Sequence, residues 1–238
     1  MAEKHHKKPQ PDWSKAIFWF VLISLVCATF FTAIRIFQIS SGAIADPPHQ
    51  QLKSDHTLML IQCILGIIVI FLPSMLVRKL NFNIPKAAVI AYFIFIYCAI
   101  FLGEIRSFYY RFEFWDDLLH LFSGGMLAIL GFIIVDALNT QKKIQVALSP
   151  LFVALFAFCF ALTIGVLWEI WEFAFDSILG LNMQKFALET GELLVGREAL
   201  SDTMHDLTID AVAAFGVAAI CYCILKTNGS KSIGSNIS

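Results

Sequence analysis

The feature that most constrains this chain is a series of six apolar stretches, each long enough to cross a membrane as a helix. A spanning helix needs about 20 mostly apolar residues, because the hydrocarbon core is about 30 Å thick and each helical residue rises about 1.5 Å. Strands of a membrane barrel would alternate polar and apolar residues, and these stretches do not alternate. The six stretches lie at residues 16–37, 57–77, 87–103, 118–138, 150–172 and 207–225.

These stretches predict an all-α integral membrane protein, built as a bundle of six transmembrane helices. Of the 238 residues, 58% are hydrophobic and only 15% are charged, whereas soluble proteins carry about a quarter charged residues. We expect a transmembrane domain over residues 16–225, a basic tail at 1–15 and a polar tail at 226–238. Pro73 lies inside the second stretch and should kink that helix, because proline lacks an N–H and its ring disturbs the preceding turn.

The positions of Lys and Arg predict which side of the membrane each loop faces. Cytoplasmic loops retain an excess of these residues. Eleven of the 17 Lys and Arg residues fall in the two tails and in the second and fourth loops, and six fall on the other side. We therefore expect both termini to be cytoplasmic, in a bacterial plasma membrane with the lipid bilayer as the surroundings.

Acidic residues have the opposite distribution. The formal net charge is −1, so the overall balance does not favour a nucleic-acid partner. Fifteen of the 18 Asp and Glu residues fall on the predicted outer side, and most of them gather at three helix ends. A carboxylate in hydrocarbon is costly, so the acids within the apolar stretches should turn into the bundle.

At these three helix ends, acids recur three or four residues apart, which is the spacing that puts side chains on one helix face. Asp116 and Asp117, for example, stand four and three residues before His120 at the start of the fourth stretch. Carboxylates and imidazoles at this spacing on neighbouring helices are how bundle proteins build metal centres. The predicted metal ligands are Asp117, His120, Glu169, Glu172, Asp202 and Asp206, with His205 and Asp210 as supporting candidates.

Three functions fit such a cluster. An oxygen-rich set of ligands with one or two histidines suits a divalent metal ion such as Mn, Mg, Ca, Fe or Zn. The ion would activate water against a lipid or envelope-precursor headgroup, which would make the protein a metal-dependent hydrolase. The alternatives are a proton- or cation-coupled transporter with Asp136 as an inner gate, and a structural membrane protein with ion-paired helix ends. The partners in those ion pairs would be Arg35, Arg106, Arg111 and Arg197.

Three segments carry a resemblance to a known family. Residues 108–120, 168–172 and 202–206 resemble the YjdF-like bacterial inner-membrane proteins, in a match that runs from about residue 55 to about residue 225. This resemblance implies a multi-pass fold and an inner-membrane location, and it implies no particular chemistry.

The order of the acidic, histidine and arginine residues is more distantly similar to the VanZ-like membrane proteins of the cell envelope. The shared positions would be taken by Asp117, His120, Glu172, Arg197, Asp202 and Asp206. This chain departs from that pattern, because Asp210 and Gly216 stand where an Asn–Gly step follows the last Asp. The similarity implies a cell-envelope compartment.

Overall fold

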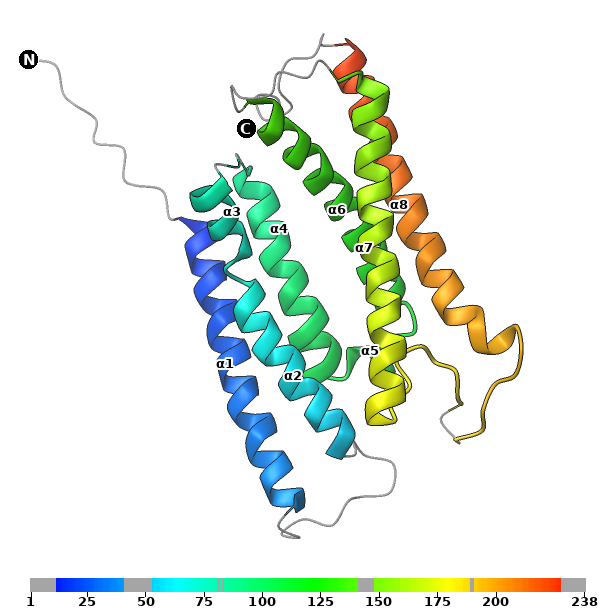
Figure 1. The fold of residues 1–238 in the computed structure, drawn as a ribbon. Coiled ribbons are helices and arrows are strands. Elements are labelled where there is room, and N and C mark those ends of the chain that lie inside the picture. The colour runs from blue at the N-terminus through cyan, green and yellow to red at the C-terminus, as the bar shows by residue number, and fades with distance from the viewer. Residues whose placement is uncertain are drawn as a thin grey trace, which may run out of the picture.

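Six helical spans run side by side along the molecule in the computed structural model, which describes residues 12–40, 53–80, 82, 84–140, 148–188 and 191–227 (Figure 1). Each span is long and apolar enough to cross a membrane, and none of the described segments forms a β-strand. The prediction of an all-α bundle of six transmembrane helices is therefore confirmed. In the order of the chain, the helices divide into two groups of three.

The first group consists of α1 (Trp13–Ser40), α2 (Lys53–Val69) with α3 (Leu72–Leu80), and α4 (Lys86–Ile96) with the π-helix η1 (Tyr97–Ile105). Apolar side chains that include Leu25, Ile70 and Phe93 form its core. The second span is interrupted just before Pro73, as predicted. A proline ring collides with the carbonyl four residues earlier, which here belongs to Val69, the last residue of α2.

The second group consists of α6 (Trp115–Thr140), α7 (Pro150–Leu179) and α8 (Ser201–Thr227). The short helix α5 (Phe108–Arg111) precedes α6, and the short 3-10 helix η2 (Glu198–Leu200) precedes α8. The hydroxyl of Ser149 caps α7, because it accepts a hydrogen bond of 3.2 Å from the backbone N–H of Phe152. Pro150 then occupies the first turn. The helix ends at Gly180, whose φ of 66° turns the chain away from the helix axis.

Small residues let the helices of the second group approach closely. Ala128, Ala161 and Ala214 form a buried contact among α6, α7 and α8. Gly131 lies so close to α7 that an added Cβ would come within 2.8 Å of the Cα of Ala157. Membrane helices commonly associate through such small residues, because lipid is as apolar as the side chains and the hydrophobic effect therefore does not drive the helices together. Close van der Waals packing drives their association instead. The cluster described below therefore lies between tightly packed helices.

The two groups meet mainly where α4 and η1 face α6. There Phe95 of α4 stacks on Phe122 of α6, with ring centroids 6.0 Å apart. The described chain enters at Trp13 and leaves at Thr227 on the same end of the bundle, as six crossings require (Figure 1). That this end faces the cytoplasm stays a prediction.

Candidate metal centre

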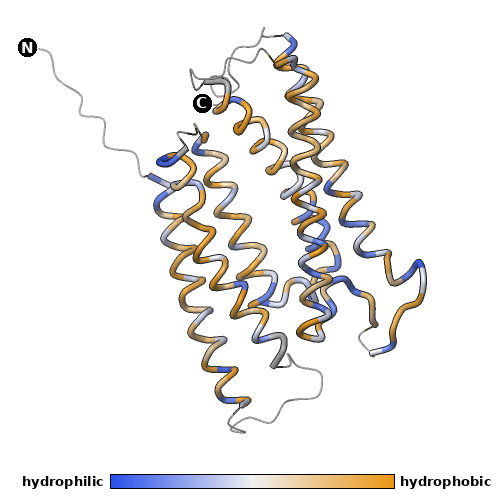
Figure 2. Tube along the Cα trace, in the orientation of Figure 1, coloured by the Kyte–Doolittle hydropathy of each residue, from blue (hydrophilic) through white to orange (hydrophobic). Residues whose placement is uncertain are grey.

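Three helix ends in the second group bring acidic and histidine side chains together. Helices α6 and α8 begin, and α7 ends, on the side of the molecule opposite Trp13 and Thr227, and hydrophilic positions lie along this half of the group (Figure 2). The ionisable side chains that are more than nine-tenths buried there are His120 on α6, Glu169, Glu172 and Asp176 on α7, and Asp206 and Asp210 on α8. The acids of these spans thus turn into the bundle, as their cost in lipid predicts.

His120 lies at the centre of this cluster. Its Nδ1 is 3.3 Å from Oδ2 of Asp210. Its Nε2 is 3.8 Å from Oδ1 of Asp116 and 3.9 Å from Oδ2 of Asp206. A proton on Nδ1 would be donated to Asp210, and the lone pair of Nε2 would then face the other two carboxylates. Metal-binding histidines are commonly held in this way, with a carboxylate on one ring nitrogen and the ion on the other.

Asp210 is in turn fixed by α6 and α7. The hydroxyl of Ser123 lies 3.5 Å from Oδ1 of Asp210. Gly165 leaves the space that the other carboxylate oxygen occupies, since a Cβ at this position would collide with Oδ2 of Asp210. Gly124 on α6 likewise leaves room for the backbone of Asp210, because a Cβ added at Gly124 would come within 2.8 Å of the Asp210 carbonyl oxygen. All three helices therefore position the carboxylate that contacts His120.

Glu169 on α7 lies beside His120 and Asp206. Its side chain is 4% exposed, and neither carboxylate oxygen has a hydrogen-bond partner in the described part of the chain. One ligand atom each of His120, Glu169 and Asp206 lies within 4.8 Å of the others. Atoms at this separation can surround one ion, because metal–ligand bonds are about 2.0–2.6 Å long. A buried carboxylate without a partner is costly, and a bound cation would remove that cost.

Asp206 also belongs to a second group of carboxylates, nearer the helix ends. Ligand atoms of Asp116, Asp202 and Asp206 again lie within 4.8 Å of one another. Between two of them lies Nζ of Lys185, which is 2.7 Å from Oδ2 of Asp116 and 2.7 Å from Oδ1 of Asp202. The lysine thus partly neutralises the outer group. No Lys or Arg among the described residues lies within ion-pair distance of Glu169 or Asp206.

The loop between α7 and α8 carries Lys185 to the cluster. The carboxylate of Asp176 accepts hydrogen bonds from the backbone N–H groups of Met183, at 2.7 Å, and Gln184, at 3.0 Å. The side-chain amide of Gln184 donates to the hydroxyl of Thr203 at 2.8 Å, which ties the loop to α8. Burial lowers the pKa of the Lys185 ammonium, but the two carboxylates raise it by more, so the net pKa lies above its ordinary value.

Four of the predicted ligands lie outside both groups, and of these four only Asp210 contacts a member of them, His120. Asp117 is 44% exposed and pairs with Nε2 of His205 at 3.4 Å, and the side chain of His205 is itself 58% exposed. Glu172 is buried, and its Oε1 accepts a hydrogen bond from Nε1 of Trp168 at 3.0 Å. The structure brings Asp210 together with the remaining members of the predicted set, which are His120, Glu169, Asp202 and Asp206.

Two residues of the cluster are not among the predicted ligands. Asp116 stands four residues before His120 and Asp117 stands three, and either spacing fits one helix face. Sequence spacing alone therefore did not distinguish them. Lys185 lies in a loop whose path no sequence pattern indicated. The four arginines considered as partners of the acids make no ion pair with a described carboxylate; they are Arg35, Arg106, Arg111 and Arg197.

Comparison with known proteins places this helical arrangement in context. A family model described as "Predicted membrane protein (DUF2238)" matches residues 17–227. An uncharacterized protein from Thermotoga maritima is 31% identical over 122 residues, which are 51% of this chain and 54% of that relative. The chain thus spans about half the length of this relative. No solved structure matches.

Proposed function

The chain belongs to the DUF2238 family of predicted membrane proteins, and we propose that it holds a divalent metal ion between α6, α7 and α8. In this proposal the ligands are His120, Glu169 and Asp206, and Asp116 and Asp202 form a second, outer group. The bound ion acts on a lipid or cell-envelope-precursor headgroup at the outer leaflet of a bacterial plasma membrane.

The observation that carries the proposal is the state of the Glu169 side chain. It is buried, both of its oxygens lack a hydrogen-bond partner among the described residues, and it lies with His120 and Asp206 in a group of ligand size. Two carboxylates with one imidazole suit Zn, Mn or Fe, whereas the all-carboxylate outer group suits Mg, Ca or Mn. The donor set therefore fits a divalent ion.

The chemistry of such a site favours hydrolysis. A divalent ion polarises a phosphoryl or carbonyl oxygen and lowers the pKa of a bound water to near neutrality. A carboxylate of the cluster beside the ion would accept the proton from that water as a general base. Because the cluster lies near the ends of three spans, the group that reaches it from the bilayer would be a headgroup and not a hydrocarbon chain.

The interior of the second group is the reason for placing hydrolysis before transport. Between the cluster and Asp136, near the other end of α6, the buried side chains of Ala128 and Phe132 pack against α7 and α8. Ala161 and Ala214 add to this apolar packing. A cation relay needs polar groups along its path, and these residues offer none. The arrangement supports chemistry at one end of the bundle.

Elemental analysis of purified protein tests the proposal. The protein is stripped with a chelator, reloaded with each of Mn, Zn and Mg, passed over a desalting column and analysed for bound metal. We expect near-stoichiometric metal in wild type and in the matched control His205→Ala, and a loss of bound metal in His120→Ala and Glu169→Gln.

The same experiment separates this proposal from a purely structural cluster held by Lys185. In the structural case, wild type and His120→Ala would hold the same, sub-stoichiometric amount of every metal. That result would contradict the proposal.

A further inference from the structure

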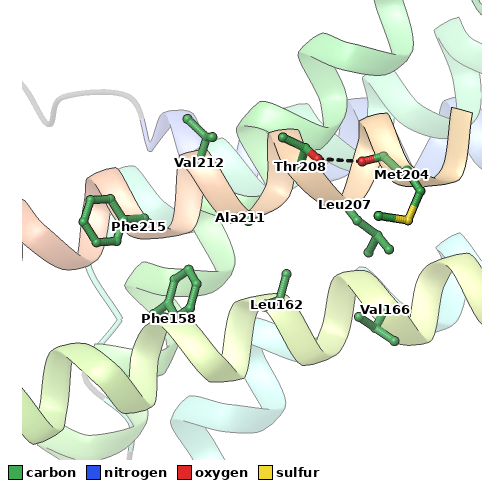
Figure 3. Close-up of a pocket in the computed structure, with 9 residues that line it drawn as sticks. All are labelled: Phe158, Leu162, Val166, Met204, Leu207, Thr208, Ala211, Val212 and Phe215. Carbon is green, nitrogen blue, oxygen red and sulfur yellow. Dashed lines mark hydrogen bonds between the residues drawn. The ribbon is translucent and has the colours of Figure 1, made fainter. Parts of the chain in front are cut away.

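An apolar groove of about 560 Å³ lies on the outside of the second group, between α7 and α8 (Figure 3). Phe158 and Phe215 line one end, and Val166 and Met204 line the other. The polar Thr208 adds little polarity, because its hydroxyl donates to the backbone carbonyl of Met204 at 2.7 Å. The surface of the groove is therefore suited to hydrocarbon.

The groove has the length of one membrane leaflet. From Met204 to Phe215 it follows α8 for about 16 Å, at about 1.5 Å per residue. One leaflet contributes about 15 Å of the hydrocarbon core. A groove on the lipid-facing side of a membrane-spanning bundle is open to lipid chains, and its length fits a single chain lying parallel to the helices.

One end of the groove lies at the same level along α7 and α8 as the proposed metal centre. On α7, Val166 lies one helical turn from Glu169, whereas Met204 and Asp206 of α8 are two residues apart and so project from different sides of that helix. Met204 also follows Thr203, which holds the loop that carries Lys185. A molecule whose chain lies in the groove would therefore have its polar end at the same depth in the membrane as the cluster.

We propose that the substrate is a phosphate-bearing lipid whose hydrocarbon chain lies in the groove between α7 and α8 and whose headgroup reaches the metal centre. This inference rests on the proposed function and names its substrate class. Without an ion the cluster is strongly acidic and repels phosphate, while a bound divalent ion together with Lys185 attracts it. Binding of the headgroup should therefore depend on metal, whereas ordinary boundary lipid should not.

Photocrosslinking in nanodiscs tests this assignment. The probe is phosphatidylglycerol with a diazirine in one acyl chain, present at low abundance in phosphatidylcholine, and labelled peptides are identified by mass spectrometry. In metal-loaded protein we expect labelling of 158–166 and 204–215 to exceed that of the lipid-facing side of α1 several-fold. Excess unlabelled phosphatidylglycerol should compete, and neither phosphatidylcholine nor inorganic phosphate should do so. Removal of metal should abolish the excess.

A matched pair of variants separates the groove from the metal centre. Ala211→Trp places a large ring in the groove and should remove the excess labelling, while Ile23→Trp, at an exposed position of α1, should not. Metal content measured in the same samples shows that each variant is folded, and Ala211→Leu serves as a milder filling variant.

The outcomes distinguish the two proposals. Even labelling of all lipid-facing helices, or equal labelling in Ala211→Trp, in protein that retains its metal overturns the groove assignment and leaves the metal centre intact. Competition by inorganic phosphate as effective as that by the lipid also overturns it, because the headgroup alone would then account for binding. Wild type that binds no metal overturns both.

Discussion

Asp210 and Gly165 show how single residues determine the geometry of the cluster. The carboxylate of Asp210 occupies the space that a side chain at Gly165 would need, and it contacts Nδ1 of His120 at 3.3 Å. Outer-sphere partners of this kind set the orientation of a metal-binding histidine, and their loss typically costs about 10–100-fold in metal affinity. Gly165 therefore helps to set the orientation of His120 in the proposed centre, although it contacts no ion itself.

Gly165→Ala should weaken metal binding without unfolding the protein. The added methyl group displaces the Asp210 carboxylate from His120, so we expect metal affinity to fall by about 10–100-fold, as for other losses of an outer-sphere partner. Titration of stripped protein with Mn or Zn measures the change. Gly216→Ala is the matched control, because a Cβ at Gly216 meets no atom within 4 Å. Equal affinity in the two variants would show that Asp210 does not orient His120.

Among the elements, the loop between α7 and α8 closes over the cluster through Lys185, whose pKa is raised by Asp116 and Asp202 against the lowering effect of burial. A lysine with a raised pKa in the folded state stabilises the fold at pH values below its unfolded pKa of about 10.4. That contribution is lost as the pH rises through the higher folded value. The tie between loop and helices should therefore persist through the physiological range.

Lys185→Met should accordingly lower the Tm of metal-free protein between about pH 7 and pH 9, and the difference from wild type should shrink above about pH 10.5. The effect should be small, because the lysine side chain is 48% exposed. Lys15→Met, which removes an exposed lysine near Asp12, is the control. A difference in Tm that stays constant across this pH range would mean that the charge of Lys185 does not hold the loop.

The helices themselves could be predicted from apolar length, but their ends at the cluster could not. Helix α7 continues to Leu179, beyond the apolar stretch that stops at residue 172, and α8 begins at Ser201, before the stretch at 207. In both places acidic residues interrupt the apolar run, and the helix continues because those acids face other parts of the protein instead of lipid: Asp176 faces the loop, and Asp202 and Asp206 face the cluster. A hydropathy pattern records that a residue is charged, but it does not record which part of the protein that residue packs against.

Part of the cluster could also be predicted from the sequence, and part could not. Helical spacing and the cost of charge in lipid are local properties, and they located His120, Glu169 and Asp206. The choice between Asp116 and Asp117 depends on how α6 is rotated against α8, which spacing does not determine. The position of Lys185 depends on a loop tied by Asp176, a long-range contact without a sequence signature.

For the whole molecule, the predicted orientation places the cluster and the loop over it on the outer side of the membrane. Val195 in that loop is 82% exposed and offers a labelling site. In a variant whose six native cysteines are replaced, Val195→Cys should react with a membrane-impermeant maleimide added outside intact bacterial cells, while Trp13→Cys should react only after lysis. Labelling of Val195→Cys only after lysis would reverse the topology and move the proposed substrate to the cytoplasmic leaflet.

The central claim is that one ion is bound directly by His120 in the second helix group. Pulsed electron paramagnetic resonance of Mn²⁺-loaded protein tests it, because nitrogen from a coordinating imidazole couples to the metal spin. We predict a ¹⁴N coupling in wild type and in His205→Ala that is absent from His120→Ala. A spectrum with no nitrogen coupling in wild type, or the same coupling in His120→Ala, would contradict this account.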